Sequence, residues 1–196
     1  MTRGRSAGYS FVELLFVVST MTVVGGMAVP QVLTGLDEFR TAGAARHVAA
    51  RLQRARMDAV VRSTDVALQV AQTAGGYTYA VYVDTNRNGV RSSEIQQGVD
   101  RRLLPVERLP DQFPGVEFGA LPGLPAVDSG GTPPGTDPIR LGSSNLATFS
   151  AAGTSSSGSL YIRGRRNAQY VVRIYGQTGR TRILRFDPRS RQWKSL

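Results

Sequence analysis

The chain begins with one long apolar segment. Tyr9 to Val29 is a run of twenty-one residues, mostly Val, Leu, Met, Gly and Phe, and Glu13 is the only charged residue in it. A helix of roughly twenty apolar residues can span a bilayer, so residues 9–29 are predicted to form a transmembrane helix. A carboxylate in such a helix is costly and marks a functional site. The segment offers Glu13 no cation at helical spacing, so we expect its partner to come from another chain.

An amphipathic helix is predicted to follow over residues 30–62. Its apolar residues recur at spacings of three and four, in a stripe that consists of Ala45, Val48, Leu52, Ala55 and Ala59. The arginines fall mostly outside this stripe, and we expect the stripe to pack on a sheet. His47 lies beside the stripe with no ligand set around it. We therefore expect a histidine at the solvent edge and not a metal ligand.

After Ser63 the pattern changes to short strands. Concentrations of β-branched and aromatic residues, or apolar residues alternating with basic ones, predict strands at residues 66–70, 77–83, 169–175 and 181–186. Gly75-Gly76 predicts a hairpin between the first two, and a Gly/Ser-rich turn lies between Phe149 and Leu160. The predicted fold class is α+β: a long amino-terminal helix, transmembrane and then amphipathic, packed on an antiparallel β-sheet domain over residues 63–196.

The segment from Gly119 to Pro138 interrupts this β domain. Five Gly and five Pro make up half of its twenty residues. These two residue types break regular structure, so a surface loop is predicted over residues 119–138. Loops of this length are either functional or disordered, and the sequence leaves both a contact loop and plain disorder open.

The net charge is strongly positive, with 24 Lys+Arg against 14 Asp+Glu in 196 residues. Lys194 is the only lysine, so the cations are guanidinium groups, which suit bidentate contacts to phosphates or carboxylates. Residues 163–196 carry a net charge of +9. A basic end of this kind indicates an anionic partner: nucleic acid, acidic lipid or an acidic protein face. A solvated basic strand face is the alternative.

The composition does not support an enzyme. The chain has no cysteine and a single histidine, and no spacing of acidic or hydroxyl residues assembles a catalytic set. We predict no catalytic residues, no metal and no cofactor. Asp84 to Gly89 begins like a calcium loop, but its twelfth position is Ile95 and Glu94 comes one place early. Its flanking residues also indicate strands and not helices, so a polar turn is the better interpretation.

The first residues fit two kinds of targeting segment. Arg3 and Arg5 precede the apolar run, so the positive-inside rule places residues 1–8 in the cytoplasm and everything after Pro30 outside. An ordinary secretory signal peptide has the same basic start, apolar run and small residues near a cut. Glu13 inside the run and Pro30 beside the cut argue against that alternative.

Gly8 followed by Tyr9-Ser10-Phe11-Val12-Glu13 resembles the class III leader of type IV pilins and type II secretion pseudopilins. The resemblance implies that a prepilin peptidase cuts after Gly8 and methylates the new amino terminus at Tyr9. Glu13 then falls at the fifth mature position, where the family has a glutamate, and Pro30 at the twenty-second, where a proline is common. Tyr9 and Ser10 are mild departures from the usual phenylalanine and threonine.

A subunit of this kind would assemble into a filament through its helix. A buried carboxylate needs a cation, and Glu13 of one subunit could meet the amino terminus at Tyr9 of its neighbour. Gly25, Gly26 and Pro30 weaken a helix locally. We therefore expect this segment to be helical in the bilayer and partly unwound in a filament. Close helix packing explains the same glycines equally well.

The rest of the chain resembles the GspH/FimT branch of the pseudopilins. The resemblance rests on residues 84–89 with Glu94, on Phe149–Thr154 followed by Gly158-Ser159-Leu160, and on Gly179-Arg180-Thr181-Arg182. The second element is similar to a glycine-turn hairpin of that branch, and the third to its terminal Gly-Arg-x-Arg element. The branch implies a non-enzymatic minor pilin or pseudopilin, anchored in the inner membrane with a periplasmic β domain and partnered by other pilin subunits.

Some members of this branch bind DNA during natural transformation through the Gly-Arg-x-Arg region. The resemblance therefore implies double-stranded DNA as an alternative partner. The arginines that would contact it are Arg180, Arg182 and Arg185, with Arg163, Arg165 and Arg166 near them. Such binding is salt-sensitive and largely indifferent to sequence. A basic edge strand that its charges protect from aggregation is the other interpretation.

Overall fold

The computed structural model describes residues 9–196, without the side chains of residues 27, 28 and 30. The chain forms two compact units, Met1–Leu36 and Asp37–Leu196. Helix α1 (Phe11–Arg62) contributes to both and contains 52 residues. No helix end falls at Pro30. The boundary expected between residues 29 and 30 is therefore one of composition and not of secondary structure.

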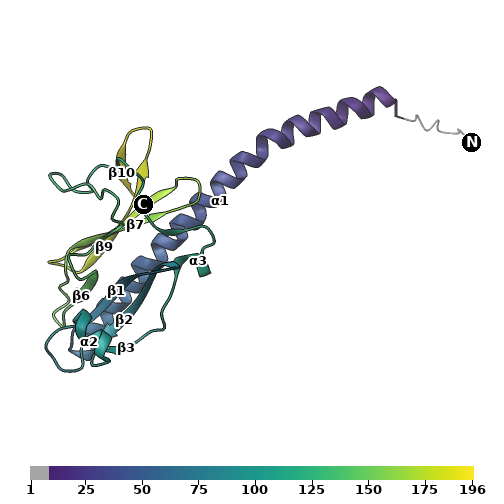
Figure 1. Ribbon diagram of the computed structural model, residues 1–196. Helices are drawn as coiled ribbons and strands as arrows, with labels where there is room; N and C mark the ends of the chain where they lie inside the picture. Colours follow the sequence, from purple (N-terminus) through teal and green to yellow (C-terminus); the bar gives the residue numbers. More distant parts are fainter. Residues whose placement is uncertain (1–8) are drawn as a thin grey trace, which may run out of the picture. The chain divides into compact units, whose positions relative to one another are not determined.

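The second unit contains two antiparallel sheets (Figure 1). The first has the order β3-β2-β1-β6, made of β1 (Val66–Thr73), β2 (Gly76–Val83), β3 (Arg101–Arg102) and β6 (Leu146–Phe149). The second has the order β10-β9-β8-β7-β4, and β5 also pairs with β7. Its strands are β4 (Glu117–Phe118), β5 (Ile139–Arg140), β7 (Gly158–Arg163), β8 (Gln169–Tyr175), β9 (Arg180–Asp187) and β10 (Gln192–Ser195). A long helix with antiparallel sheets confirms the predicted α+β class.

The hairpin predicted at Gly75-Gly76 is confirmed. The β1–β2 pairing runs from Val66 opposite Val83 to Thr73 opposite Gly76. Gly76 has φ +104°, a conformation that glycine adopts without steric cost. The local turn chemistry was therefore sufficient to place this hairpin.

The Gly/Ser-rich turn predicted between Phe149 and Leu160 is present, with Phe149 bridged to Ser155 across it, but its two flanking strands belong to different sheets. Phe149 pairs with Val66 in the first sheet, whereas Leu160 pairs with Val172 in the second. The chain does turn back locally, since the Ser150 N–H donates to the Thr154 carbonyl at 2.9 Å. It then crosses to the second sheet. Each strand has a more extensive partner within its own sheet, which a local turn signal does not reveal.

Two short helices interrupt the strands, α2 (Ser92–Gln97) and α3 (Leu109–Gln112). The expectation that strands flank residues 84–89 on both sides is wrong, because β2 precedes this turn and α2 follows it. The next strand, β3, returns to pair with β2, with Tyr82 opposite Arg102. A six-residue helix with no buried residue leaves no periodic apolar signal in the sequence.

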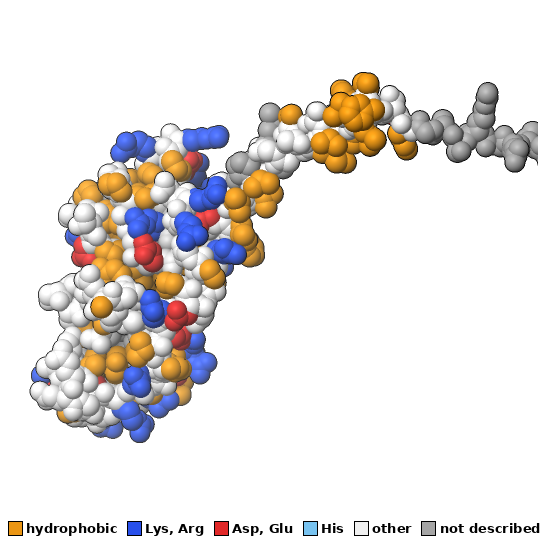
Figure 2. All heavy atoms as spheres, turned by 45° about the vertical axis from the view of Figure 1, so that its right-hand side comes forward, with side chains coloured by type: hydrophobic (Ala, Val, Ile, Leu, Met, Phe, Trp, Pro, Cys, Tyr) orange, Lys and Arg blue, Asp and Glu red, His pale blue; other side chains and the backbone are white. Residues whose placement is uncertain are grey.

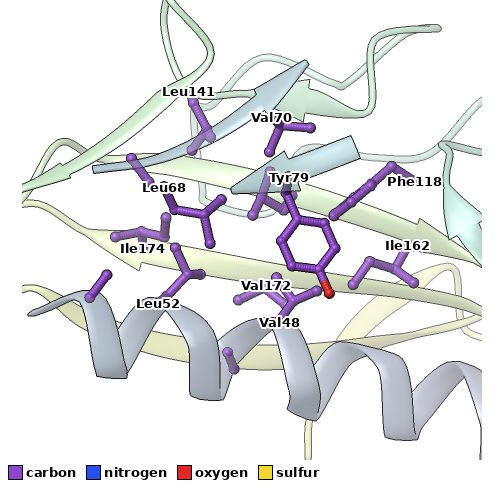
Figure 3. Close-up of a cluster of buried hydrophobic side chains, with 14 of the residues drawn as sticks. Val48, Leu52, Leu68, Val70, Tyr79, Phe118, Leu141, Ile162, Val172 and Ile174 are labelled. Atoms are coloured by element: carbon purple, nitrogen blue, oxygen red, sulfur yellow. The ribbon is translucent and has the colours of Figure 1, made fainter. Parts of the chain in front are cut away.

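The apolar stripe of α1 packs against both sheets, as predicted. All five of its residues are completely buried. Figure 3 shows Val48 and Leu52 of α1 pointing toward Leu68 of the first sheet and Val172 of the second. Aromatic rings close the space between the sheets, with Tyr79 and Phe118 in edge-to-face contact at 5.9 Å. One core thus joins the helix and both sheets, as burial of apolar surface requires.

A polar cluster around Glu107 lies beside this core and includes His47. His47 Nε2 lies 3.0 Å from Glu107 Oε2, and Arg51 Nη2 lies 2.7 Å from Oε1. Tyr79 also donates its hydroxyl to Glu107 at 3.0 Å. The histidine, whose side chain is 23 % exposed, therefore lies at the solvent edge as expected, with its ring nitrogen bound to Glu107. Its partner is more than fifty residues away in sequence, so no local pattern indicated it.

The same network shifts two pKa values. Burial by itself raises the pKa of Glu107, but the hydrogen bonds from His47 and Tyr79 and the charge of Arg51 outweigh burial and leave this pKa below its usual value. Burial and the neighbouring Glu107 raise the pKa of Tyr79 far above its usual value. Glu107 is thus held ionised and Tyr79 neutral, the arrangement in which the phenol donates to the carboxylate.

Candidate functional site

Residues 11–26 of α1 present an apolar surface to their surroundings. Every side chain of this segment is exposed, including large ones such as Phe11, Phe16 and Met21, each at least 70 % exposed. Figure 2 shows the hydrophobic side chains gathered along this arm. By length and composition, α1 contains a segment that could cross a membrane. Exposed apolar surface of this extent marks a membrane or protein contact.

Glu13 lies in the first turn of α1. A carboxylate there is favoured by the helix dipole, but within residues 9–196 it has no hydrogen bond or ion pair. Tyr9 is 81 % exposed. The predicted cleavage residue, Gly8, lies outside the described residues, and so does the side chain of Pro30.

The six arginines predicted to contact DNA do not form one group. Arg163 Nη2 lies 2.5 Å from Glu117 Oε1, and Arg185 forms an ion pair with Glu38 of α1. Arg165 and Arg166 occupy the turn between β7 and β8 with exposed side chains. Their backbone N–H groups donate to the two carboxylate oxygens of Asp37, at 2.9 and 2.8 Å. Arg163 and Arg165 line one cavity beside this turn, and Arg185 pairs with the helix residue next to Asp37. These four arginines therefore lie near the β7–β8 turn, whereas Arg180 lies opposite Tyr175 at the other end of β8.

Arg180 and Arg182 are different, because both are exposed on β9 and have no ion pair among the described residues. Side chains alternate between the two faces of a strand. Leu184, on the same face as these arginines, belongs to a small cluster away from α1, whereas Ile183 packs against the main core. Arg180 and Arg182 therefore lie on the face of the second sheet that points away from α1, here called the outer face. Arg185 lies on the opposite face.

Two further arginines share the outer face and were missed in the sequence. Arg173 of β8 lies directly opposite Arg182, and Ser159 of β7 lies opposite Arg173. Arg140 of β5 lies opposite Ser159 in turn. These four residues form one line across four strands, here called the basic row. The alternation of apolar and polar residues over 169–175 could have indicated which face of the strand carries Arg173. That Arg173 lies opposite Arg182 depends on the register between β8 and β9, which only the structure shows.

The loop over residues 119–138 is partly packed, and residues 129–133 and 135–137 are exposed. It has no helix or strand, as predicted. Its first part covers the apolar half of the outer face, where Leu124 is buried against the cluster that contains Tyr161 and Val171. Trp193 Nε1 donates to the carbonyl of Pro125 at 3.1 Å. Gln169 holds the start of the loop by accepting the Leu121 N–H at 3.0 Å.

The polar turn predicted at residues 84–89 is confirmed. Asp84 Oδ1 accepts the N–H groups of Asn86 and Arg87, and Oδ2 accepts that of Gly89 at 2.7 Å. Both carboxylate oxygens of Asp84 therefore stabilise the turn by accepting its backbone N–H groups. No group of three His, Cys, Asp or Glu residues in the described part of the chain is arranged to hold a metal ion.

A long apolar helix joined to an antiparallel β domain defines a pilin-like protein. A family model for the type II transport protein GspH matches residues 44–179. The chain therefore belongs to the GspH family, a family of structural pseudopilins. This confirms the resemblance to the GspH/FimT branch of the pseudopilins.

Two individual proteins are similar to the chain. The chain is 38 % identical over 82 residues to the pilin-like protein PilA1 of Thermus thermophilus. The matched region covers 41 % of this chain and 50 % of that protein. The chain thus spans about half the length of the curated relative that it matches. The minor pseudopilin EpsH from the type 2 secretion system of Vibrio cholerae is 13 % identical, with a TM-score of 0.46 over 74 % of this chain and 97 % of that chain.

Proposed function

We propose that this chain is a structural subunit, a minor pilin or pseudopilin, of a type II secretion pseudopilus or a type IV pilus, and that it assembles through α1. The observation that carries the proposal is the exposed apolar surface of residues 11–26 with the single carboxylate of Glu13. Such a surface is compatible with a bilayer or a bundle of similar helices, not with water. Membership of the GspH family supports the same function.

Assembly in this proposal begins with the leader. Prepilin peptidase cuts after Gly8 and methylates Tyr9, and the basic residues Arg3 and Arg5 keep the leader on the cytoplasmic side of the inner membrane. The β domain then lies in the periplasm. In the filament, Glu13 pairs with the amino terminus of Tyr9 on a neighbouring subunit, which compensates the cost of burying the carboxylate.

Mass spectrometry of the mature amino terminus tests this scheme. The expected chain begins at Tyr9 and carries one added methyl group. An intact leader, or a chain that begins near Val29 as after signal-peptide cleavage, would contradict it.

A second candidate function is binding of double-stranded DNA during natural transformation. The observation that favours it is the pair Arg180 and Arg182, which are exposed on one face and have no ion pair within residues 9–196. Guanidinium groups in this state are available to phosphates. The full chain in detergent should bind duplex DNA at low salt and lose affinity at high salt. Absence of binding at low salt would exclude this function.

A further inference from the structure

The basic row is an uninterrupted line of side chains on one face. Arg140, Ser159, Arg173 and Arg182 are consecutive Cα partners across β5, β7, β8 and β9. Neighbouring strands lie about 4.8 Å apart, so the row extends over roughly 14 Å. Duplex DNA carries one charge per about 1.7 Å of its axis, so a row of this length can follow several phosphates.

The row carries three positive charges and little compensation. Arginines directly opposite each other on adjacent strands, as Arg173 and Arg182 are, repel. Neither Arg140 nor Arg182 has an ion pair in the part of the chain that the structure describes. An anion bound along the row would relieve this repulsion, which is why a phosphodiester backbone fits it better than a neutral partner does.

Arg173 is the arginine of the row whose guanidinium already has an ion-pair partner. Its Nη2 lies 2.6 Å from Asp128 Oδ2, and its Nη1 donates to the Ser159 hydroxyl at 3.3 Å. Its Nε is buried with no acceptor. The guanidinium also lies 5.8 Å from the ring centre of Tyr175, which is on the same face beside Arg180.

Asp128 belongs to the loop over residues 119–138, and this loop borders the row. A cavity of about 470 Å³ lies between them, lined by Asp128, Thr132, Asp137, Arg140, Ser159 and Arg173 among others. Arg140 holds the loop only through long contacts of 3.4 and 3.5 Å to the carbonyls of Pro133 and Pro134. Asp128 is therefore the one carboxylate of the loop in ion-pair contact with the row.

We propose that the basic row, with Arg180 and Tyr175 beside it, is the surface on which a nucleic-acid backbone binds, and that Asp128 occupies one phosphate position until the backbone replaces it. This inference rests on the second candidate function. It moves the site from the six arginines expected from the sequence to the outer face, adds Arg140 and Arg173, and assigns the loop a competing role. Binding exchanges the Arg173–Asp128 ion pair for an Arg173–phosphate pair.

The test compares two double variants of the full chain in detergent, titrated with duplex DNA over a range of salt concentrations. Arg140→Ala with Arg182→Ala removes two charges from the row. Arg101→Ala with Arg102→Ala removes two exposed charges from β3 in the first sheet and is the matched control. The row variant should bind several-fold more weakly, with the slope of log K against log salt reduced by about 1.8. The control should match the unaltered chain.

A third variant, Asp128→Asn, tests the competition. Without the loop carboxylate, DNA should bind about two- to fivefold more tightly, the worth of an exposed ion pair. Unchanged affinity would overturn the role of Asp128. Binding that survives in the row variant but is lost in Arg165→Ala with Arg166→Ala would overturn the location of the surface and leave the candidate function intact. Absence of DNA binding by the unaltered chain would overturn both. Equal competition by polyglutamate would overturn the assignment to a phosphodiester.

Discussion

The carboxylate of Asp37 accepts the backbone N–H of Arg165 at 2.9 Å and thereby ties α1 to the turn between β7 and β8. Thr41, one helical turn further along α1, donates its hydroxyl to the Asp37 carbonyl at 2.6 Å. Both residues lie against Gly164. A Cβ atom added to Gly164 would overlap the Thr41 hydroxyl and lie 2.6 Å from Asp37 Oδ2. The contact requires a residue without a side chain at this position.

Replacing Gly164 by alanine should destabilise the second unit. The added methyl group has to displace either the turn or α1, and overpacking of this kind costs about 1–3 kcal/mol. Thermal unfolding of the chain in detergent measures the effect. Gly35→Ala is the control, since a Cβ at Gly35 meets no atom within 4 Å and alanine favours a helix by up to about 1 kcal/mol. Equal melting temperatures for the two variants would contradict the proposed contact.

Glu107→Gln should reduce both the stability and its dependence on pH. At pH 7 the loss of a buried, charged acceptor costs about 1–3 kcal/mol. The pKa of Glu107 is lowered in the folded state, so its contribution is complete above the unfolded value of about 4.3 and is lost as the pH falls through the folded value. The unaltered protein should therefore lose more stability than the variant on acidification below about pH 4.3.

Chemical denaturation at several pH values makes this comparison. Glu117→Gln serves as the control, because Glu117 is 55 % exposed and its ion pair is worth about 0–1 kcal/mol. Parallel stability curves for Glu107→Gln and the unaltered protein would show that Glu107 does not contribute to the acid dependence.

Glu13→Val should leave the leader cleaved but reduce incorporation into filaments. The proposed partner of Glu13 lies on another subunit, since Glu13 has no partner within residues 9–196. The fraction of subunit recovered with sheared filaments measures incorporation, and Ser19→Ala, in the same exposed segment, is the control. Normal incorporation of Glu13→Val would remove the role proposed for this carboxylate.

Trp193→Ala should release the loop over residues 119–138. Trp193 contacts the rings of Tyr161 and Phe186, at 5.9 and 5.3 Å, and donates to Pro125. Without these contacts the loop opens more often, and thermolysin should cut it about tenfold faster, since proteolysis follows the population of the open form. Trp193→Phe keeps most of the ring packing and should have a smaller effect. Equal acceleration in both variants would assign the closure to the Nε1 hydrogen bond, and no acceleration in Trp193→Ala would assign it to residues other than Trp193.

The local elements of this fold follow from the sequence because their signals are local. Spacings of three and four place Ala45 to Ala59 on one helix face, and all five stripe residues are buried. Gly75-Gly76 separates two runs of strand-forming residues, and these runs pair as the β1–β2 hairpin. The uncharged run after Glu13 indicates the apolar arm for the same reason.

Associations between distant segments required the tertiary structure. His47 meets Glu107 sixty residues away, and Asp37 meets Arg165 at a separation of 128 residues. The division into two sheets, which separates Phe149 from Leu160, depends on which longer strand each one pairs with. The short helix α2, which has no fully buried residue and packs only Ile95 against an apolar cluster, gave no periodic apolar pattern to detect.

By itself the sequence determined the long helix and the strands β1, β2, β8 and β9, the apolar arm with its one carboxylate, and the excess of arginine at the carboxy-terminal end. These properties depend on residue type and on spacings of a few positions. Only the tertiary structure decided which arginines act together. Strand register determines which side chains lie next to one another on a face, and ion pairs determine which of them remain available to a partner. In the tertiary structure, Arg185 pairs with Glu38 of α1 and Arg163 pairs with Glu117. Strand register places Arg182, Arg173 and Arg140 in one row.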